Sequence, residues 1–117
     1  MLQLVVLVLN DATQLEPLLE AWTNAGAQGI TVLHSTGFAR LRGGWRRDDA
    51  PLFPSLRDLL EYDDLHHRTL FTVVDDDALV DRLIAAAQRV VGDLDAENTG
   101  ILFTVPVGRV LGLQRRS

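Results

Sequence analysis

The side chains best suited to chemistry gather in one arginine-rich stretch, "GFARLRGGWRR", at residues 37–47. It holds four arginines and one tryptophan among three glycines. A local basic segment can meet an acidic protein or a phosphorylated ligand, and arginine and tryptophan are favoured at protein interfaces. The composition predicts a docking segment, with a solvated loop kept soluble by its charge as the alternative. The residues assigned to docking are Arg42, Trp45, Arg46, Arg47 and Phe53.

Acidic and histidine residues offer a second kind of chemistry, the coordination of a divalent cation. Asp93, Asp95 and Glu97 have a spacing that could serve Mg²⁺ or Ca²⁺, but an acidic turn is the preferred interpretation. The aspartates at 75–77 are expected to cap the helix that follows them. The adjacent histidines at 66–67 point to opposite sides of an extended chain, so they are interpreted as surface residues at a strand start. No residue is assigned as a metal ligand.

The residue types that are missing exclude several kinds of catalysis. The chain has no cysteine, and all 11 of its basic residues are arginine. Disulfides, thiolate metal sites, cysteine nucleophiles and Schiff-base chemistry are therefore excluded. No Ser/His/Asp order with its motif context, Gly-rich phosphate loop or His-x-x-x-His pair occurs. The sequence predicts a protein without enzymatic activity.

Length and charge limit the class of protein further. A chain of 117 residues that is 47% hydrophobic predicts one compact domain over residues 1–117. The net charge of −5 disfavours nucleic-acid binding, which depends on the neutralisation of phosphates. No apolar run reaches the ~20 residues of a membrane span, and the N-terminal segment lacks the features of a signal peptide. We expect a cytoplasmic protein that does not insert into membranes.

Four apolar segments are predicted to be β-strands. Residues 2–9 form a nearly continuous Leu/Val run, as expected of a strand that is buried on both faces. His34 on the second strand is expected to be packed or to lie in an interface. The other strands are 29–36, 68–74 and 100–105, and residues 107–113 are expected to form a final short extended piece.

Two helices are predicted between these strands. The first begins either at a capping box of Thr13 and Glu16 or with Pro17 at its first position, and it ends at Gly26. The second follows the aspartates at 75–77 and has a clear apolar stripe. The order β-α-β, long loop, β-α-β predicts an α+β, ferredoxin-like sandwich with both helices on one face of an antiparallel sheet. Since three of the strands are apolar on both sides, we expect an oligomer to cover the other face.

Three segments together resemble the nitrogen-regulatory PII signalling family. "AWTNAGAQGITVLHSTGFAR" is similar to the family's passage from its first helix into its second strand, and "TVVDDDALVDRLIAAAQ" to the passage from its third strand into its second helix. "ILFTVPVGRVLGL" is similar to the family's last strand and C-terminal segment. The resemblance covers most of the chain except the middle loop.

This resemblance implies a homotrimer that binds an adenine nucleotide in clefts between subunits and regulates a partner protein. Residues 37–67 would be the T-loop, which docks on a transporter, enzyme or regulator. Residues 92–100 would be the B-loop, the second segment that contacts the ligand. The effector-binding residues that it implies are Thr31, Gly37, Phe38, Ala39, Arg40, Val73, Gly92, Asn98, Thr99 and Gly100.

The chain departs from the family where phosphates and 2-oxoglutarate would be held. The B-loop lysines are absent from "GDLDAENTG", and the C-terminal arginines fall on Gly112 and Gln114, with Arg115 and Arg116 close by as the alternative phosphate contacts. Leu41 stands in the place of the glutamine that holds a 2-oxoglutarate–magnesium complex, and Tyr62 is not a clear counterpart of the tyrosine modified in relatives. Repulsion by the B-loop carboxylates would have to be relieved by a divalent ion such as Mg²⁺.

These departures favour a small adenylate such as AMP or cyclic AMP over ATP. Two alternatives stay open. One is a CutA-like trimer that binds divalent metal, for which the chain offers weak ligands, and the other is a structural trimer whose effector site has decayed. The partner, the pathway and the identity of the effector do not follow from the sequence.

Overall fold

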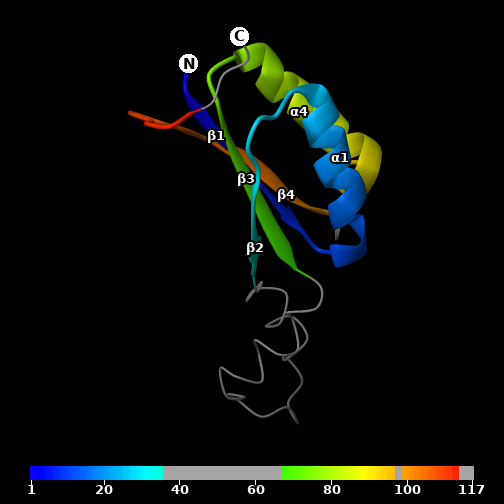
Figure 1. The fold of residues 1–117 in the computed structure, drawn as a ribbon. Coiled ribbons are helices and arrows are strands. Elements are labelled where there is room, and N and C mark those ends of the chain that lie inside the picture. Colours follow the sequence, from blue (N-terminus) through cyan, green and yellow to red (C-terminus); the bar gives the residue numbers. More distant parts are fainter. Residues whose placement is uncertain (36–66, 97–98, 114–117) are drawn as a thin grey trace, which may run out of the picture.

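The computed structural model describes residues 1–35, 67–96 and 99–113, which form a sheet covered on one face by two helices (Figure 1). The docking residues, His66 and Tyr62 lie outside the described residues. Along the chain the elements are β1 (Gln3–Leu9), a 3₁₀ turn η1 (Ala12–Gln14), α1 (Leu15–Ala25), β2 (Thr31–His34), β3 (Arg68–Val74), α4 (Asp77–Val91) and β4 (Gly100–Pro106).

The four strands form one antiparallel sheet in the order β2-β3-β1-β4. In the middle of the sheet Leu7 pairs with Leu70 on β3 and with Leu102 on β4. The strands β2 and β4 are thus the two edges. This topology, with both helices on one face, confirms the predicted mixture of helices and antiparallel strands.

The core lies between the helices and the alternate residues of β1 and β3 that face them. Val5, Leu7 and Leu70 are fully buried there. Trp22 of α1 is also fully buried, and its indole Nε1 donates a hydrogen bond to the carbonyl oxygen of Leu83 in α4 at 3.1 Å. A tryptophan with a satisfied N–H joins the two helices, so the helix layer is held to the sheet as a unit.

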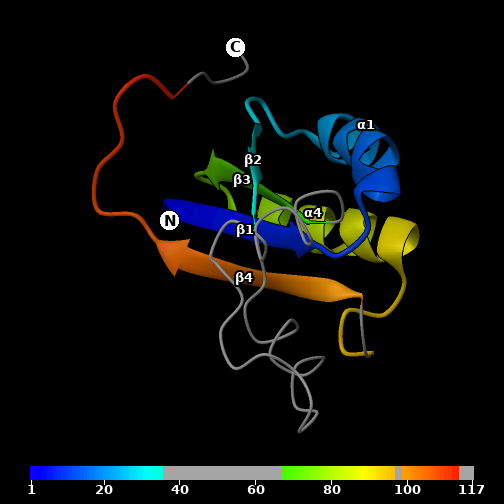
Figure 2. The same cartoon turned by 90° about the horizontal axis from the view of Figure 1, so that it is seen from below.

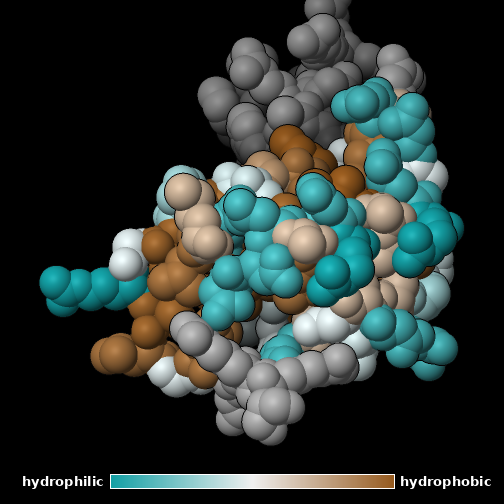
Figure 3. Space-filling view, turned by 90° about the horizontal axis from the view of Figure 1, so that it is seen from above, coloured by the Kyte–Doolittle hydropathy of each residue, from teal (hydrophilic) through white to brown (hydrophobic). Residues whose placement is uncertain are grey.

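The opposite face of the sheet is apolar and open in the single chain. Ile101, Phe103 and Val105 on β4 are 56%, 43% and 40% exposed, and Leu33 on β2 is 49% exposed. In Figure 3 hydrophobic surface gathers on the left of the molecule, whereas the right of the view is mostly hydrophilic. The strand residues on this face are Leu4, Val6, Val8, Thr31, Leu33, Thr69, Phe71, Val73, Ile101, Phe103 and Val105.

The first helix does not begin at either of the predicted positions. It begins at Leu15, directly after η1, and Gln14 at its N-cap makes no side-chain capping bond. Asp11 instead caps the 3₁₀ turn, where its carboxylate accepts hydrogen bonds from the backbone N–H and the hydroxyl of Thr13. The capping-box prediction is wrong because Thr13 lies within the 3₁₀ turn that Asp11 caps, and Gln14 takes the N-cap position of α1. The predicted end is confirmed, since Gly26 follows α1 with φ of 122°.

The second helix follows the predicted pattern closely. Asp76 is its N-cap, and its carboxylate accepts from the backbone N–H of Ala78 at 2.9 Å. Gly92 ends the helix with a positive φ of 88°, which suits glycine at this position. The prediction that the aspartates at 75–77 cap this helix is confirmed for Asp76, and Asp77 lies in the first turn.

Three smaller predictions are corrected by the structure. The second strand covers only Thr31–His34, the four residues that pair with β3, and not the predicted 29–36. The last strand runs on through Pro106, a residue that an edge strand can accommodate, and residues 107–113 form no strand. His67 is only 3% exposed, so it is buried and not the surface residue that was predicted. His34 is exposed in the single chain, and a place in an interface stays the prediction for it.

Candidate functional site

The edge of the sheet formed by β2 and β3 holds two of the predicted effector residues close together. Thr31 pairs directly with Phe71, so the two side chains stand side by side on the open face of the sheet. Val73 lies on the same face, two residues further along β3. Thr72 points the other way and is buried, and its hydroxyl donates to the carbonyl oxygen of Gly29 at 2.6 Å. This bond fixes the chain that leads into β2.

The C-terminal segment completes a cavity at this edge. Figure 2 shows the segment leaving β4 and curving round the end of the sheet toward the chain that precedes β2. The backbone N–H of Val107 donates to the carbonyl oxygen of Leu2 at 3.0 Å, which ties the start of the segment to the sheet. The cavity of about 360 Å³ is lined by Gln28, Gly29, Ile30, Thr31, Phe71, Thr72, Val73, Val110, Leu111, Gly112 and Leu113.

The cavity has mostly apolar walls with a few uncharged groups that can form hydrogen bonds. None of the described residues that line it carries a charged side chain. The hydroxyl of Thr31 makes no hydrogen bond to another described residue, so it can bind a ligand group. Phe71 beside it offers an aromatic ring. A hydroxyl next to an aromatic ring suits a planar ligand that has hydrogen-bonding edges.

A second cavity of about 340 Å³ adjoins the first, and Gln28, Val73 and Leu113 line both. Its other walls come from the end of α1 and the start of α4, and they include Arg82, Asp75 and Asp76. Arg82 is held in place by a hydrogen bond from its Nε to the carbonyl oxygen of Ala25 at 3.2 Å. One guanidinium and two carboxylates leave this second cavity without an excess of positive charge.

The remaining described effector residues lie at the other edge of the sheet. Gly92 ends α4, and Thr99 and Gly100 lead into β4. Thr31 and Phe103 occupy one row across the sheet, three strand spacings or about 14 Å apart. The structure therefore brings Thr31 and Val73 together and leaves these three residues on the far side. Gly37, Phe38, Ala39, Arg40 and Asn98 lie outside the described residues.

The segment after α4 is an acidic turn in its described part. A carboxylate oxygen of Asp93 accepts from the backbone N–H of Asp95 at 2.9 Å, and the carbonyl oxygen of Asp93 accepts from Ala96 at 3.0 Å. The hydroxyl of Thr99 donates to the carbonyl oxygen of Ala96 at 2.9 Å. These bonds agree with the acidic-turn interpretation. Within residues 1–35, 67–96 and 99–113, no three His, Cys, Asp or Glu side chains gather as a metal site would require.

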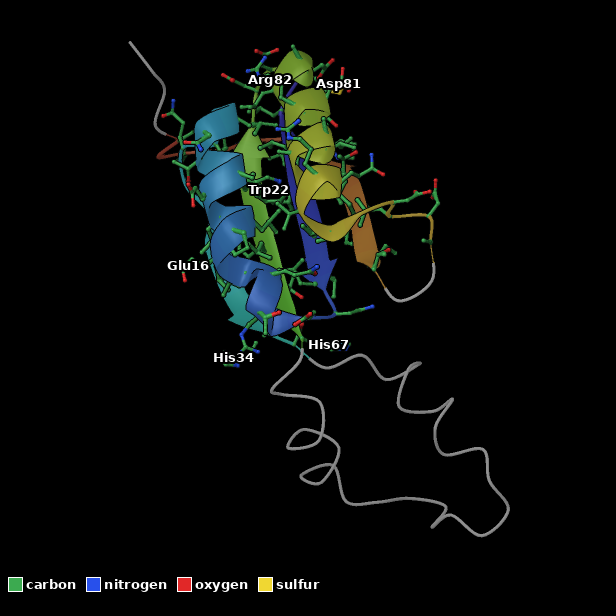
Figure 4. The ribbon with its side chains drawn as sticks, turned by 90° about the vertical axis from the view of Figure 1, so that its right-hand side faces the viewer. Glu16, Trp22, His34, His67, Asp81 and Arg82 are labelled. Carbon is green, nitrogen blue, oxygen red and sulfur yellow. The ribbon has the colours of Figure 1, made fainter. Side chains whose placement is uncertain are left out.

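The two described histidines lie at the end of the sheet opposite Arg82 and Asp81 (Figure 4). His34 ends β2 and pairs with Arg68, which directly follows His67. The guanidinium of Arg68 donates to the carbonyl oxygen of His67 at 2.8 Å. Across the same strand pair, the hydroxyl of Thr69 donates to that of Ser35 at 2.8 Å. The bond between Thr69 and Ser35 is therefore the polar contact that joins β3 to the residue after β2.

Phe71, Gln28 and the residues Val110, Leu111 and Leu113 are parts of the cavity that sequence reasoning missed, whereas the resemblance had already placed Gly112 near the ligand. The signal for Phe71 was present, since the alternation of β3 puts it on the same face as Val73. Gln28 and the segment 110–113 carry no local pattern that points to the cavity, because their place there depends on contacts between distant parts of the chain.

Residues 2–116 match the family model for nitrogen regulatory protein P-II. A comparison with curated proteins gave no match. In the part of the chain that the structure describes, no helix has both the length and the apolar character needed to cross a membrane.

Proposed function

We propose that this chain, which belongs to the nitrogen regulatory protein P-II family, is a non-enzymatic regulator that binds a small effector between its subunits and acts on a partner protein. The family match supports a P-II-type regulatory protein.

The cavity at the β2–β3 edge is the proposed effector site. Thr31 and Val73 were both assigned to effector binding, and both line this one cavity with Phe71 between them on the sheet. Its volume of about 360 Å³ is in the range of small-ligand pockets. The effector proposed for it is a small adenylate such as AMP or cyclic AMP, with Mg²⁺ needed only if several phosphates must be held near carboxylates.

A homotrimer is the proposed assembly, and the sheet supports it in two ways. The open face carries a continuous row of exposed apolar side chains, and monomeric proteins seldom leave a large apolar patch in water. In addition, Gly92, Thr99 and Gly100 lie at the opposite edge from Thr31, so they can join the same site only from another copy. Closed symmetry with three copies would supply both the cover and the second half of each site.

The segment 37–67 is the proposed docking element, and it begins and ends at the strands that carry the effector cavity. Since β2 and β3 flank both the cavity and this segment, a ligand at Thr31 can affect the base of the segment through the paired strands. Arg42, Trp45, Arg46, Arg47 and Phe53 are the residues proposed to meet the partner. We place the protein in the cytoplasm and propose no nucleic-acid or membrane partner.

The main support for this function is that Thr31 and Val73 line the same cavity, whose described walls carry no charged side chain. Calorimetric titration with a panel of adenine nucleotides tests it, together with the mass of the assembly by light scattering. We expect binding by the natural chain, weakened in Thr31→Val and unchanged in the matched variant Thr104→Val, which lies on β4 outside the cavity. A chain that binds none of the nucleotides at millimolar concentration would overturn the effector role.

A further inference from the structure

The second cavity, between the end of α1 and the start of α4, has walls of a different kind from those of the effector cavity. Its volume of about 340 Å³ lies at the small end of the range of ligand pockets. One guanidinium and two carboxylates line it beside larger aliphatic side chains, which are those of Val73, Val74, Leu79 and Leu113. A ligand that fills this cavity must therefore match charges of both signs and an aliphatic surface.

The guanidinium of Arg82 is held in place and keeps donors for a ligand. Its Nε donates to the carbonyl oxygen of Ala25 at 3.2 Å. Its Nη2 lies beside Gly26, since a Cβ built on this glycine would be 3.8 Å from that nitrogen. The Nη groups make no hydrogen bond or ion pair with another described residue. Such a pair of N–H groups matches the two oxygens of a carboxylate.

Asp76 brings a fixed carboxylate to the same cavity. Its Oδ1 accepts from the backbone N–H of Ala78 at 2.9 Å, which holds the side chain at the start of α4. A carboxylate that accepts one such bond can accept others from a ligand. These two described residues, Arg82 and Asp76, make no ion pair with each other, so both charges are available on the walls of one cavity.

This arrangement suits a ligand that carries a carboxylate and an ammonium together. A simple cation would be repelled by Arg82, and a simple anion would be repelled by the aspartates. A zwitterion meets the opposite charge at each of its ends. The aliphatic side chains of the cavity add a wall on which an apolar side chain of the ligand can be buried.

We propose that the second cavity binds a small aliphatic α-amino acid, with its carboxylate on Arg82, its ammonium on Asp76 and its side chain against Leu79. This inference goes beyond the proposed function, because the amino acid binds beside the effector cavity and not in it. Gln28, Val73 and Leu113 line both cavities, so a ligand in one lies against walls of the other.

The test is an NMR titration of the isotope-labelled full chain with leucine, followed at the backbone amide of Gly26 and the Nε–H of Arg82. The matched probes are N-acetylleucine, which keeps only the carboxylate, and leucinamide, which keeps only the ammonium. We expect leucine to shift both signals until they saturate. Each derivative should bind about tenfold more weakly, as expected for the loss of one hydrogen bond between charged groups.

Two variants test the two charged contacts, and two others on the same helix are their controls. Asp76→Asn removes the charge and keeps the helix cap, since asparagine caps helices as well as aspartate does. Asp76→Asn and Arg82→Gln should each weaken leucine binding about tenfold at the Gly26 amide. Asp81→Asn and Arg89→Gln change exposed residues of α4 outside the cavity, so we expect the affinity of the natural chain.

The outcomes separate this inference from the proposed function. If millimolar leucine shifts neither signal, the second cavity is not an amino-acid site. If N-acetylleucine binds as tightly as leucine, or Asp76→Asn binds leucine like the natural chain, the ammonium contact is wrong and so is the choice of a zwitterion. The titration contains no nucleotide, so failure of leucine leaves AMP binding untouched, and failure of AMP leaves the amino-acid site standing.

Discussion

The role of the open face of the sheet can be tested by placing one charge on it. Phe103 lies on β4 and faces away from the helices, in the same row as Val6 and Phe71. Thr104, the next residue, faces the other side of the sheet and is exposed. The variants Phe103→Asp and Thr104→Asp therefore add the same charge to neighbouring positions of one strand, on opposite faces.

The size of the effect follows from the surface that Phe103 leaves in water. This side chain is 43% exposed in the single chain. Of the roughly 200 Å² that a phenylalanine can bury, about 85 Å² is therefore available for burial between copies. At ~25 cal/mol per Å² this amounts to about 2 kcal/mol for each copy and about 6 kcal/mol for three. The assembly constant should fall by roughly four orders of magnitude, before the cost of burying a carboxylate is added.

Sedimentation velocity over a range of concentrations measures this effect, with circular dichroism to confirm that each variant is folded. We expect a trimer for the natural chain and for Thr104→Asp, and a monomer for Phe103→Asp. A folded Phe103→Asp variant that stays trimeric would show that this face is not the one buried between copies. Equal dissociation of both variants would point to an effect of charge that does not depend on the face.

Two further predictions concern the stability of the fold. Gly100 has φ of 129°, and a Cβ there would press on the carbonyl oxygen of Val8. In urea titrations, Gly100→Ala should therefore lower the free energy of unfolding by about 2–4 kcal/mol. Gly108→Ala is the control, and since Gly108 has open space around it we expect a loss of ~0.5 kcal/mol or less. Trp22→Phe removes the hydrogen bond to Leu83 and part of a buried ring, so the free energy of unfolding should fall by about 1–3 kcal/mol by the same method. An unchanged urea midpoint would mean that this bond does not hold the helices together.

The parts of the fold that the sequence predicts well are those whose signals are local. The strand Arg68–Val74 has the predicted bounds because its apolar residues alternate on a buried central strand. The helix α4 also follows its pattern, since Asp76 caps its start and Gly92 ends it. The start of α1 was predicted wrongly because two plausible signals overlapped and a third residue, Asp11, made the bond that decides it.

The candidate site could be predicted only in part, because its walls come from distant segments. Thr31 and Val73 were assigned through the resemblance, and the sheet brings them together. The approach of the segment 110–113 to the chain before β2 depends on the path of the C-terminus round the sheet. No periodicity or turn signal in that short segment encodes such a path.

The strand order links the open face to the divided site. Because β2 and β4 are the two edges of the sheet, a ligand beside Thr31 cannot also touch Gly100 of the same chain. The apolar residues of the open face lie between these two edges, so the contact that covers them also sets how near the β4 edge of one copy comes to the β2 edge of another. Assembly and effector binding should therefore be coupled. A folded monomer made by Phe103→Asp should bind AMP more weakly than Thr104→Asp does, although neither residue lines the cavity.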